Sequence, residues 1–178
     1  PRNQNNQVNK VPLLVRAQGV EIGIRSQMLD GFDSSITLFG LDYKSEILFV
    51  GDAGTTEPSR PSRRYGVEWA NHYKYASWLS FDVDLTWSHA RFTAPDPSDP
   101  AIGNFVPGAP TMIAAAGFTI GDDNMGWFGG ARLRFFGPRP LDEERSISSK
   151  ATTLVNGRVG YAFDNGIKLQ LLLVFRFK

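Results

Sequence analysis

The sequence predicts an all-β protein, an antiparallel up-and-down transmembrane β-barrel segment of about eight strands. The first observation is strict alternation, which puts Leu79, Phe81, Val83, Leu85 and Trp87 on one side of a strand and Ser80, Asp82, Asp84, Thr86 and Ser88 on the other. Unpaired charge is costly to bury. Two aspartates on one face therefore favour a wet lumen on that side and lipid on the other. The second observation is strand length, and the third is the order of the connections.

The first half of the chain contains four strand-like segments, at residues 15–29, 35–50, 65–75 and 78–92. Residues 1–12 are rich in Asn and Gln and predict a loop. In the first segment Val20, Ile22 and Ile24 alternate with Glu21, Gly23 and Arg25. The second sets Phe39, Leu41 and Tyr43 against Gly40, Asp42, Lys44 and Glu46, and the third sets Tyr65, Val67 and Trp69 against Gly66, Glu68 and Ala70. In the fourth, Trp78 and Trp87 lie near the two ends of the apolar row, as interfacial aromatic residues do.

The second half contains four more segments, at residues 111–120, 127–136, 151–163 and 167–177. Their apolar rows are Met112 to Phe118, Ala131 to Phe135, Val155 to Tyr161 and Ile167 to Phe177, each read at every second residue. Most of the eight segments have 10 to 15 residues. A strand that crosses lipid needs about 9–11 residues, whereas strands of soluble proteins have about 5–6. Length therefore favours a membrane barrel.

The connections alternate between short and long. Short ones lie at 30–33, 76–77, 121–125 and 164–166, and long ones at 51–64, 93–110 and 137–149. Outer-membrane barrels have short periplasmic turns and longer extracellular loops. We therefore expect the first strand to descend from the outer surface and the eighth to end there, which is the topology of a piece of a larger barrel.

Composition excludes several classes of protein. No run approaches the ~18 apolar residues of a membrane helix. The net charge of +1 argues neither for nor against nucleic acid, since no basic block stands out, and nucleic acid is not among the expected partners. Cysteine is absent, which excludes a disulfide framework. The chain starts without Met or an apolar signal region, so we expect a mature product or a fragment.

Five segments taken together resemble a known family. SRRYGVEWANHY, WLSFDVDLTWSHARF, a loop ending in VPGAP, GWFGGARLRFFGPRPL and TLVNGRVGYAF are similar, in this order, to the C-terminal barrel region of TonB-dependent receptors. GVEIGIRSQML matches the strand that opens this region, and the resemblance covers about residues 15–170.

The resemblance implies a fold, a location and a set of partners. Family members are 22-stranded barrels of the Gram-negative outer membrane, plugged by an N-terminal domain. They import a scarce nutrient, such as a ferric siderophore or cobalamin, by TonB-coupled active transport. The expected partners are outer-membrane lipid and lipopolysaccharide, the plug domain, TonB indirectly, and a small-molecule or metal-chelate ligand.

The resemblance also implies which part of the receptor is present. We expect residues 1–178 to be the C-terminal portion of the barrel, without the plug domain or signal peptide. The family continues after a strand like GIKLQL with an Asn-Leu-Phe-Asn/Asp segment, an outer loop and a descending strand. This chain reads LLLVFRFK there, so the final strand is expected to be missing.

Candidate site residues are charged. Arg60, Arg63 and Arg64 beside a long loop are candidates for binding an anionic ligand, because guanidinium groups suit carboxylates. The residues predicted to face the lumen and to form cross-strand charge ladders are Glu21, Arg25, Asp42, Lys44, Glu46, Glu68, Asp82, Asp84, Arg132, Arg134 and Arg158. His72 and His89 are the only histidines and lack metal-site spacing, so no catalytic residue, metal site or cofactor is predicted.

Three alternatives remain open at this point. A small standalone barrel with a structural or passive pore role would have both termini in the periplasm. An outer-membrane serine hydrolase barrel would lose ester hydrolysis on a Ser→Ala change. A soluble β-sandwich would stay in the aqueous phase without detergent. The transported ligand is not encoded in any motif of the sequence.

Overall fold

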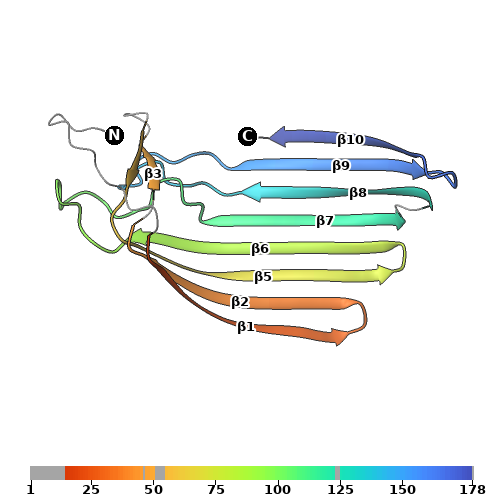
Figure 1. Ribbon diagram of the computed structural model, residues 1–178, viewed down its shortest axis with the longest axis horizontal. Coiled ribbons are helices and arrows are strands. Elements are labelled where there is room, and N and C mark those ends of the chain that lie inside the picture. Colours follow the sequence, from red (N-terminus) through yellow and green to blue (C-terminus); the bar gives the residue numbers. More distant parts are fainter. Residues whose placement is uncertain (1–14, 46, 51–54, 123–124, 178) are drawn as a thin grey trace.

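The computed structural model describes residues 15–45, 47–50, 55–122 and 125–177, which form one large antiparallel sheet and one small hairpin (Figure 1). The large sheet contains β1 (Ala17–Leu29), β2 (Phe32–Tyr43), β5 (Ser62–Ala76), β6 (Leu79–Phe92), β7 (Met112–Asp122), β8 (Met125–Phe136), β9 (Thr152–Ala162) and β10 (Lys168–Phe177). They lie side by side in this order, each antiparallel to the next. The prediction of an all-β, up-and-down architecture with eight strands is confirmed.

The strands are long enough to cross a bilayer. The strands of the large sheet range from 10 residues in β10 to 15 in β5, against the roughly 9–11 that a crossing requires. The long connections gather at one end of the sheet and the tight turns at the other (Figure 1). The described residues contain no helix that could span a membrane.

The pairing register separates two faces. Trp69, Leu85, Ala114 and Phe135 are paired in one row across β5 to β8, and this row, with every second residue of each strand, forms the apolar face. The adjacent row of Ala70, Asp84, Ala115 and Arg134, with every second residue from it, forms the polar face. Alternation and pairing agree because successive side chains of a strand point to opposite sides.

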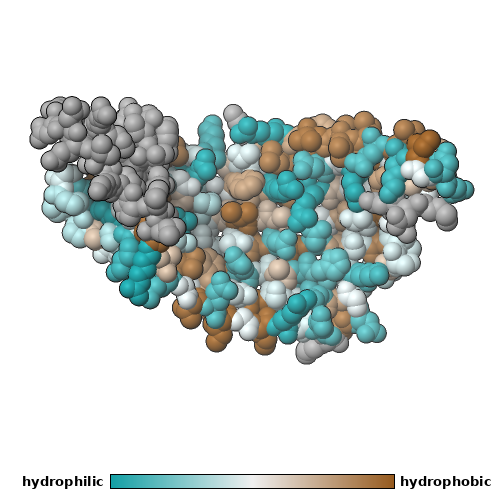
Figure 2. Space-filling view, viewed as in Figure 1, coloured by the Kyte–Doolittle hydropathy of each residue, from teal (hydrophilic) through white to brown (hydrophobic). Residues whose placement is uncertain are grey.

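No second layer of the described structure covers the apolar face. Val20, Ile22 and Ile24 are each more than 70% exposed, and Trp69 and Trp87 are exposed as well. The hydrophobic residues buried among those described are Phe92, Val106, Phe128 and Ala162. Figure 2 also shows hydrophobic side chains gathered along the β10 edge. An uncovered apolar surface of this extent requires lipid or a partner.

The predicted second strand, 35–50, was too long. β2 ends at Tyr43, opposite Ser62 of β5, and the apolar segment β3 (Ile47–Val50) instead pairs with β4 (Thr55–Pro58). The expected loop 51–64 therefore contains a hairpin strand. Alternation alone does not distinguish one long strand from a strand followed by a short hairpin.

The faces predicted for the second strand were also wrong. Ile36 and Leu38 lie opposite Ile24 and Ile22, so they form the apolar row, and Phe39 lies opposite Glu21 on the polar face. Asp42 consequently shares the apolar-face register, opposite Gln18 and Arg63, and was wrongly assigned to the charge ladder. When apolar residues occupy both the odd and the even positions of a strand, its sequence does not decide which of its faces is the apolar one.

The turn at Asp30-Gly31 is tight, as predicted. Gly31 adopts a φ of 74°, and a Cβ there would lie 2.4 Å from the Lys74 carbonyl oxygen of the neighbouring hairpin. The Lys74 amide donates to the Gly31 carbonyl at 2.7 Å. Glycine is therefore required both by the backbone conformation and by the close approach of β5.

Candidate functional site

Charged side chains from five strands, β1, β5, β6, β8 and β9, share the polar face. Of the residues predicted to face the lumen, the register places the following on this face: Glu21, Arg25, Glu68, Asp82, Asp84, Arg132, Arg134 and Arg158. Lys44 lies beyond the end of β2, where its amide donates to the Arg16 carbonyl, and lines a cavity with Asp42. No pairing register assigns Lys44 to a face, so its place in the charge ladder stays a prediction. Glu46 lies outside the described residues.

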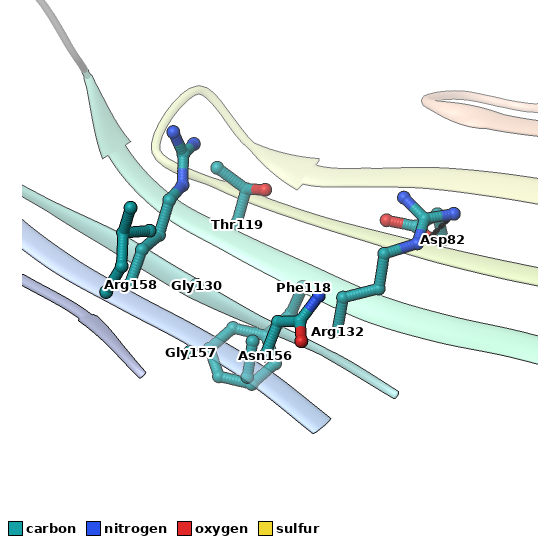
Figure 3. Close-up of a pocket in the computed structure, with 10 residues that line it drawn as sticks. Asp82, Phe118, Thr119, Gly130, Arg132, Asn156, Gly157 and Arg158 are labelled. Carbon is teal, nitrogen blue, oxygen red and sulfur yellow. Dashed lines mark ion pairs between the residues drawn. The ribbon is translucent and has the colours of Figure 1, made fainter. Parts of the chain in front are cut away.

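The centre of the polar face is an ion-pair cluster. Arg132 Nη2 on β8 lies 3.1 Å from Asp82 Oδ2 on β6 (Figure 3). The same nitrogen lies 3.2 Å from Asp84 Oδ2, also on β6. β7 runs between these strands, and its residue opposite Asp82 and Arg132 is Gly117. A Cβ at Gly117 would lie 3.0 Å from Asp82 Oδ1. The missing side chain leaves room for the two charges to meet across a strand.

A cavity of about 220 Å³ adjoins this cluster. It is lined on the polar face by Asp82, Arg132, Asn156, Arg158 and Leu172 (Figure 3). Gly130 and Gly157 add little bulk to its wall. The cavity combines two guanidinium groups, a carboxylate and an amide with the apolar side chains of Phe118, Ala131 and Leu172, which suits a molecule with both polar and apolar parts.

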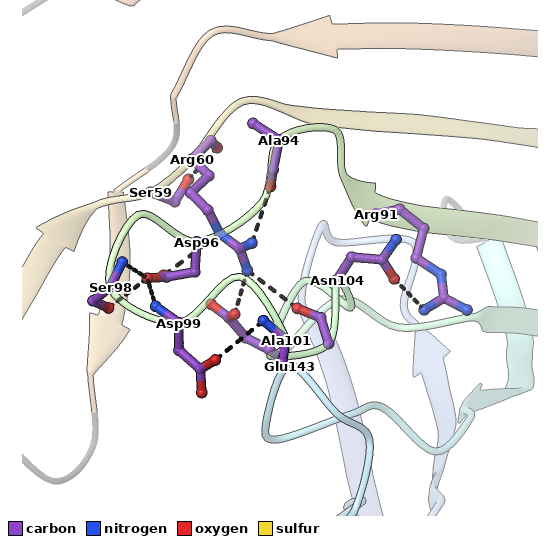
Figure 4. Close-up of polar contacts among 11 residues, drawn as sticks. Ser59, Arg60, Arg91, Ala94, Asp96, Ser98, Asp99, Ala101, Asn104 and Glu143 are labelled. Carbon is purple, nitrogen blue, oxygen red and sulfur yellow. Dashed lines mark hydrogen bonds and ion pairs between the residues drawn. The ribbon is translucent and has the colours of Figure 1, made fainter.

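Arg60 joins three of the long connections at the other end of the sheet. Its Nη1 donates to the Ala94 carbonyl at 3.0 Å and its Nη2 to the Gly103 carbonyl at 3.3 Å, and it forms an ion pair with Glu143 (Figure 4). Its guanidinium also lies over the Phe92 ring, 4.3 Å from the centroid. The Arg60 side chain is only 10% exposed, so its donors are directed at the protein.

Two of the long loops are also stabilised by hydrogen bonds within the loop. In residues 93–110, the Asp96 carboxylate accepts from the Ser98 amide at 2.7 Å and from the Asp99 amide at 3.2 Å. The Ser98 hydroxyl also donates to this carboxylate and is the largest cause of the lowered pKa of Asp96, which lies below 3.8. The two amide hydrogen bonds lower this pKa further. Five prolines exclude regular structure here, and the Asp-centred turns replace it.

In residues 137–149, Asp142 plays the same part. Its carboxylate accepts from the amides of Ser146 at 2.8 Å and Ile147 at 3.0 Å. The Ser146 hydroxyl is the largest cause of the lowered pKa of Asp142. The neighbouring Glu143 has a raised pKa, because burial outweighs its attraction to Arg60.

Phe105 links these two loops to the end of β6. The Arg91 and Arg145 guanidinium groups both lie over its ring, and the Phe105 amide donates to the Glu143 carbonyl at 3.0 Å. Val106 beside it is almost fully buried. The loops are therefore packed against each other.

The structure does not bring Arg60, Arg63 and Arg64 together. Arg60 belongs to the loop junction, and Arg63 lies on the apolar-face register, where its Nε is 2.8 Å from Asp42 Oδ1. Arg64 lies on the polar face, 5.6 Å from the Tyr43 ring centroid. Arg63 and Arg64 are successive residues of β5 and therefore point to opposite faces, whereas Arg60 precedes the strand.

Sequence reasoning missed the loop residues that complete the junction. Glu143 is 83 residues from Arg60, and Phe105 is 14 residues from Arg91. No spacing pattern predicts such pairs. The one available signal was the combination of acidic and aromatic residues inside proline-rich loops, which is unusual for featureless linkers.

The side chains of His89 and Ser88 have structural partners. His89 Nε2 accepts from Arg91 Nε at 3.0 Å, and its ring lies 5.2 Å from the Tyr65 ring. The Ser88 hydroxyl donates to the Pro110 carbonyl at 2.9 Å. Within the described ranges, no three His, Asp or Glu side chains gather into a metal-binding group.

Comparison with known proteins identifies one family. The sequence model of the family described as "TonB dependent receptor-like, beta-barrel" matches residues 3–173, nearly the whole chain. No curated protein is significantly similar to the chain.

Proposed function

The chain belongs to the TonB-dependent receptor-like β-barrel family, whose members are outer-membrane receptors and transporters, and we propose that it forms part of the wall of such a receptor in a Gram-negative outer membrane. The observation that supports this most strongly is the single-layer sheet. One face is apolar and uncovered, and the other carries the charges. A bilayer on one side and a water-filled lumen on the other satisfy both faces.

In this proposal the polar face lines the import path. The cluster of Asp82, Asp84 and Arg132 and the adjoining cavity face the lumen, where the plug domain and the ligand pass. Arg64 is the one predicted ligand arginine on this face. Arg60 contributes indirectly by holding the outer loops together. The transported molecule would be a scarce nutrient such as a ferric siderophore or cobalamin, with energy supplied through TonB.

The proposal includes further strands at both edges. β1 and β10 form the edges of the described sheet. An unpaired backbone group in lipid costs several kcal/mol, so neither edge is stable there without a neighbouring strand. In a larger closed barrel, additional strands would pair with both.

Topology tests the membrane location. The chain contains no cysteine, so a maleimide labels only the single cysteine that each variant introduces. Ala101→Cys lies in a long loop and Ser77→Cys in a short turn, and both positions are exposed. A membrane-impermeant maleimide should label Ala101→Cys on intact cells and Ser77→Cys only after the outer membrane is permeabilised. Labelling of both sites on intact cells would refute the proposed orientation.

Uptake tests the transport role. Cells that carry the intact receptor should lose accumulation of its ferric chelate or cobalamin when TonB is deleted, and should retain binding at the surface. Uptake that persists without TonB would favour a passive pore. A receptor for which no ferric chelate or cobalamin shows binding would refute the ligand class.

A further inference from the structure

A cavity of about 230 Å³ lies at the long-loop end of the sheet, where β1, β2 and β5 meet the outer connections. Its described lining includes Arg16, Lys44 and Arg63, together with Gln18, Asp42 and Thr93. Three cations and one carboxylate therefore surround a small space. Arg63 is 61% exposed and forms an ion pair with that carboxylate, Asp42.

Part of the lining of this cavity lies on the apolar face, and Tyr43 and Ser62 add to it from the polar-face register. Gln18, Asp42 and Arg63 occupy the apolar-face register, and the next positions along β1 and β5 are Val20 and Tyr65. Ile22, Ile24 and Leu38 continue the row, all of them exposed. A cationic cavity therefore adjoins an uncovered hydrocarbon strip on the same side of the sheet.

We propose that this rim cavity binds the phosphate of an anionic lipid headgroup, with the acyl chains of that lipid lying along the strip below it. Guanidinium and ammonium groups recognise phosphate through charge-assisted hydrogen bonds. Continuity with the apolar strip selects a lipid rather than a free anion, since only a lipid uses both parts. The inference rests on the proposed membrane location, and it assigns the lipid to the leaflet on the long-loop side.

Asp42 adjusts the strength of this site. Its carboxylate holds Arg63 at 2.8 Å and offsets part of the positive charge that faces the phosphate. The site is therefore weaker than three cations alone would make it. Removal of the carboxylate should strengthen lipid binding, a change that loss of folding does not mimic.

The test uses the purified protein in detergent and three probes: a phosphorylated glycolipid, the same glycolipid after dephosphorylation, and inorganic phosphate. Native mass spectrometry counts bound lipid. A cation near a membrane surface contributes about fivefold to the affinity for anionic lipid. Lys44→Gln and Arg63→Gln should each weaken binding of the phosphorylated lipid by about that factor, and Asp42→Asn should strengthen it. Lys74→Gln, a cation at the short-turn end of β5, is the matched control and should change nothing.

Equal binding of the phosphorylated and the dephosphorylated glycolipid would overturn the proposal, because the rim cavity would then not recognise the phosphate. Inorganic phosphate that competes fully with the lipid at equal concentration would assign the cavity to free anions instead. Equal weakening by Lys74→Gln would also overturn it. A protein that passes the topology test above and fails here refutes this inference alone, whereas a protein that fails the topology test refutes the membrane proposal.

Discussion

Arg132 on β8 lies 3.1 Å from the carboxylate of Asp82 on β6, although β7 runs between their strands. Adjacent strands are about 4.8 Å apart, so the two backbones are separated by about twice that distance. The contact depends on Gly117, whose missing side chain leaves the space between them open. A glycine on the middle strand thus couples charges on non-adjacent strands.

The first prediction concerns this coupling. A double-mutant cycle of Asp82→Asn and Arg132→Gln should give a coupling free energy of about 0.2–1 kcal/mol, the range for exposed ion pairs. In a Gly117→Val background the coupling should fall to nearly zero, because the new side chain fills the space beneath Asp82. Urea unfolding of the protein in lipid vesicles measures the free energies.

Gly157→Val is the control for the glycine. A Cβ at Gly157 meets no atom within 4 Å, so the coupling should survive there. An equal coupling free energy in the Gly117→Val and wild-type backgrounds would show that the Asp82–Arg132 contact does not depend on the space at Gly117.

The second prediction concerns Arg60. Arg60→Gln removes the partner of Glu143 and weakens the hold on the Ala94 and Gly103 carbonyls. Partly buried groups left without partners cost about 1–3 kcal/mol. Hydrogen exchange in residues 93–110 and 137–149 should accelerate accordingly, while exchange in β5 and β6 should stay unchanged.

Arg63→Gln serves as the comparison. Its ion pair with Asp42 is well exposed, so its loss should change loop exchange little. If the two arginine variants behaved alike, Arg60 would not be the junction of the outer loops.

Sequence reasoning succeeded where one parity of a strand is apolar and the other is not. β6 is such a strand, and its faces follow directly from Leu79 to Trp87. It failed in β2, because Phe39 and Leu41 are apolar at one parity and Ile36 and Leu38 at the other, and only pairing with β1 decides between them.

The site was less predictable than the fold. Its charged residues were visible as a set, since they share the polar parity of their strands. The contacts were not, because Arg132 lies 48 residues from Asp84 and Arg60 lies 83 residues from Glu143. Such pairs depend on which strands and loops come together, and alternation within a strand contains no information about that.

The third prediction is a pH dependence in the 137–149 loop. The pKa of Asp142 lies below 3.8 because its ionised form accepts the Ser146 and Ile147 donors. A lowered carboxyl pKa contributes stability that is present above the unfolded value and is lost as pH falls through the folded value. Below about pH 4, protection of the Ser146 and Ile147 amides, corrected for intrinsic exchange, should therefore decrease.

Asp142→Asn should remove this transition at both amides. Asp96→Asn, which alters the equivalent turn in the other loop, should leave it in place. Protection that stays constant from pH 6 to the acid limit in the wild-type protein would contradict the assignment.

The fourth prediction tests the corrected faces of β2 with two adjacent residues. Leu38 lies on the apolar face, opposite Ile22, and Phe39 lies on the polar face, opposite Glu21. A spin label at Leu38→Cys should be more accessible to oxygen, which concentrates in lipid, and a label at Phe39→Cys more accessible to a water-soluble nickel complex. The chain has no other cysteine to interfere. The reverse pattern would restore the assignment from alternation alone, in which Phe39, Leu41 and Tyr43 face lipid, and would remove Asp42 and Lys44 from the rim.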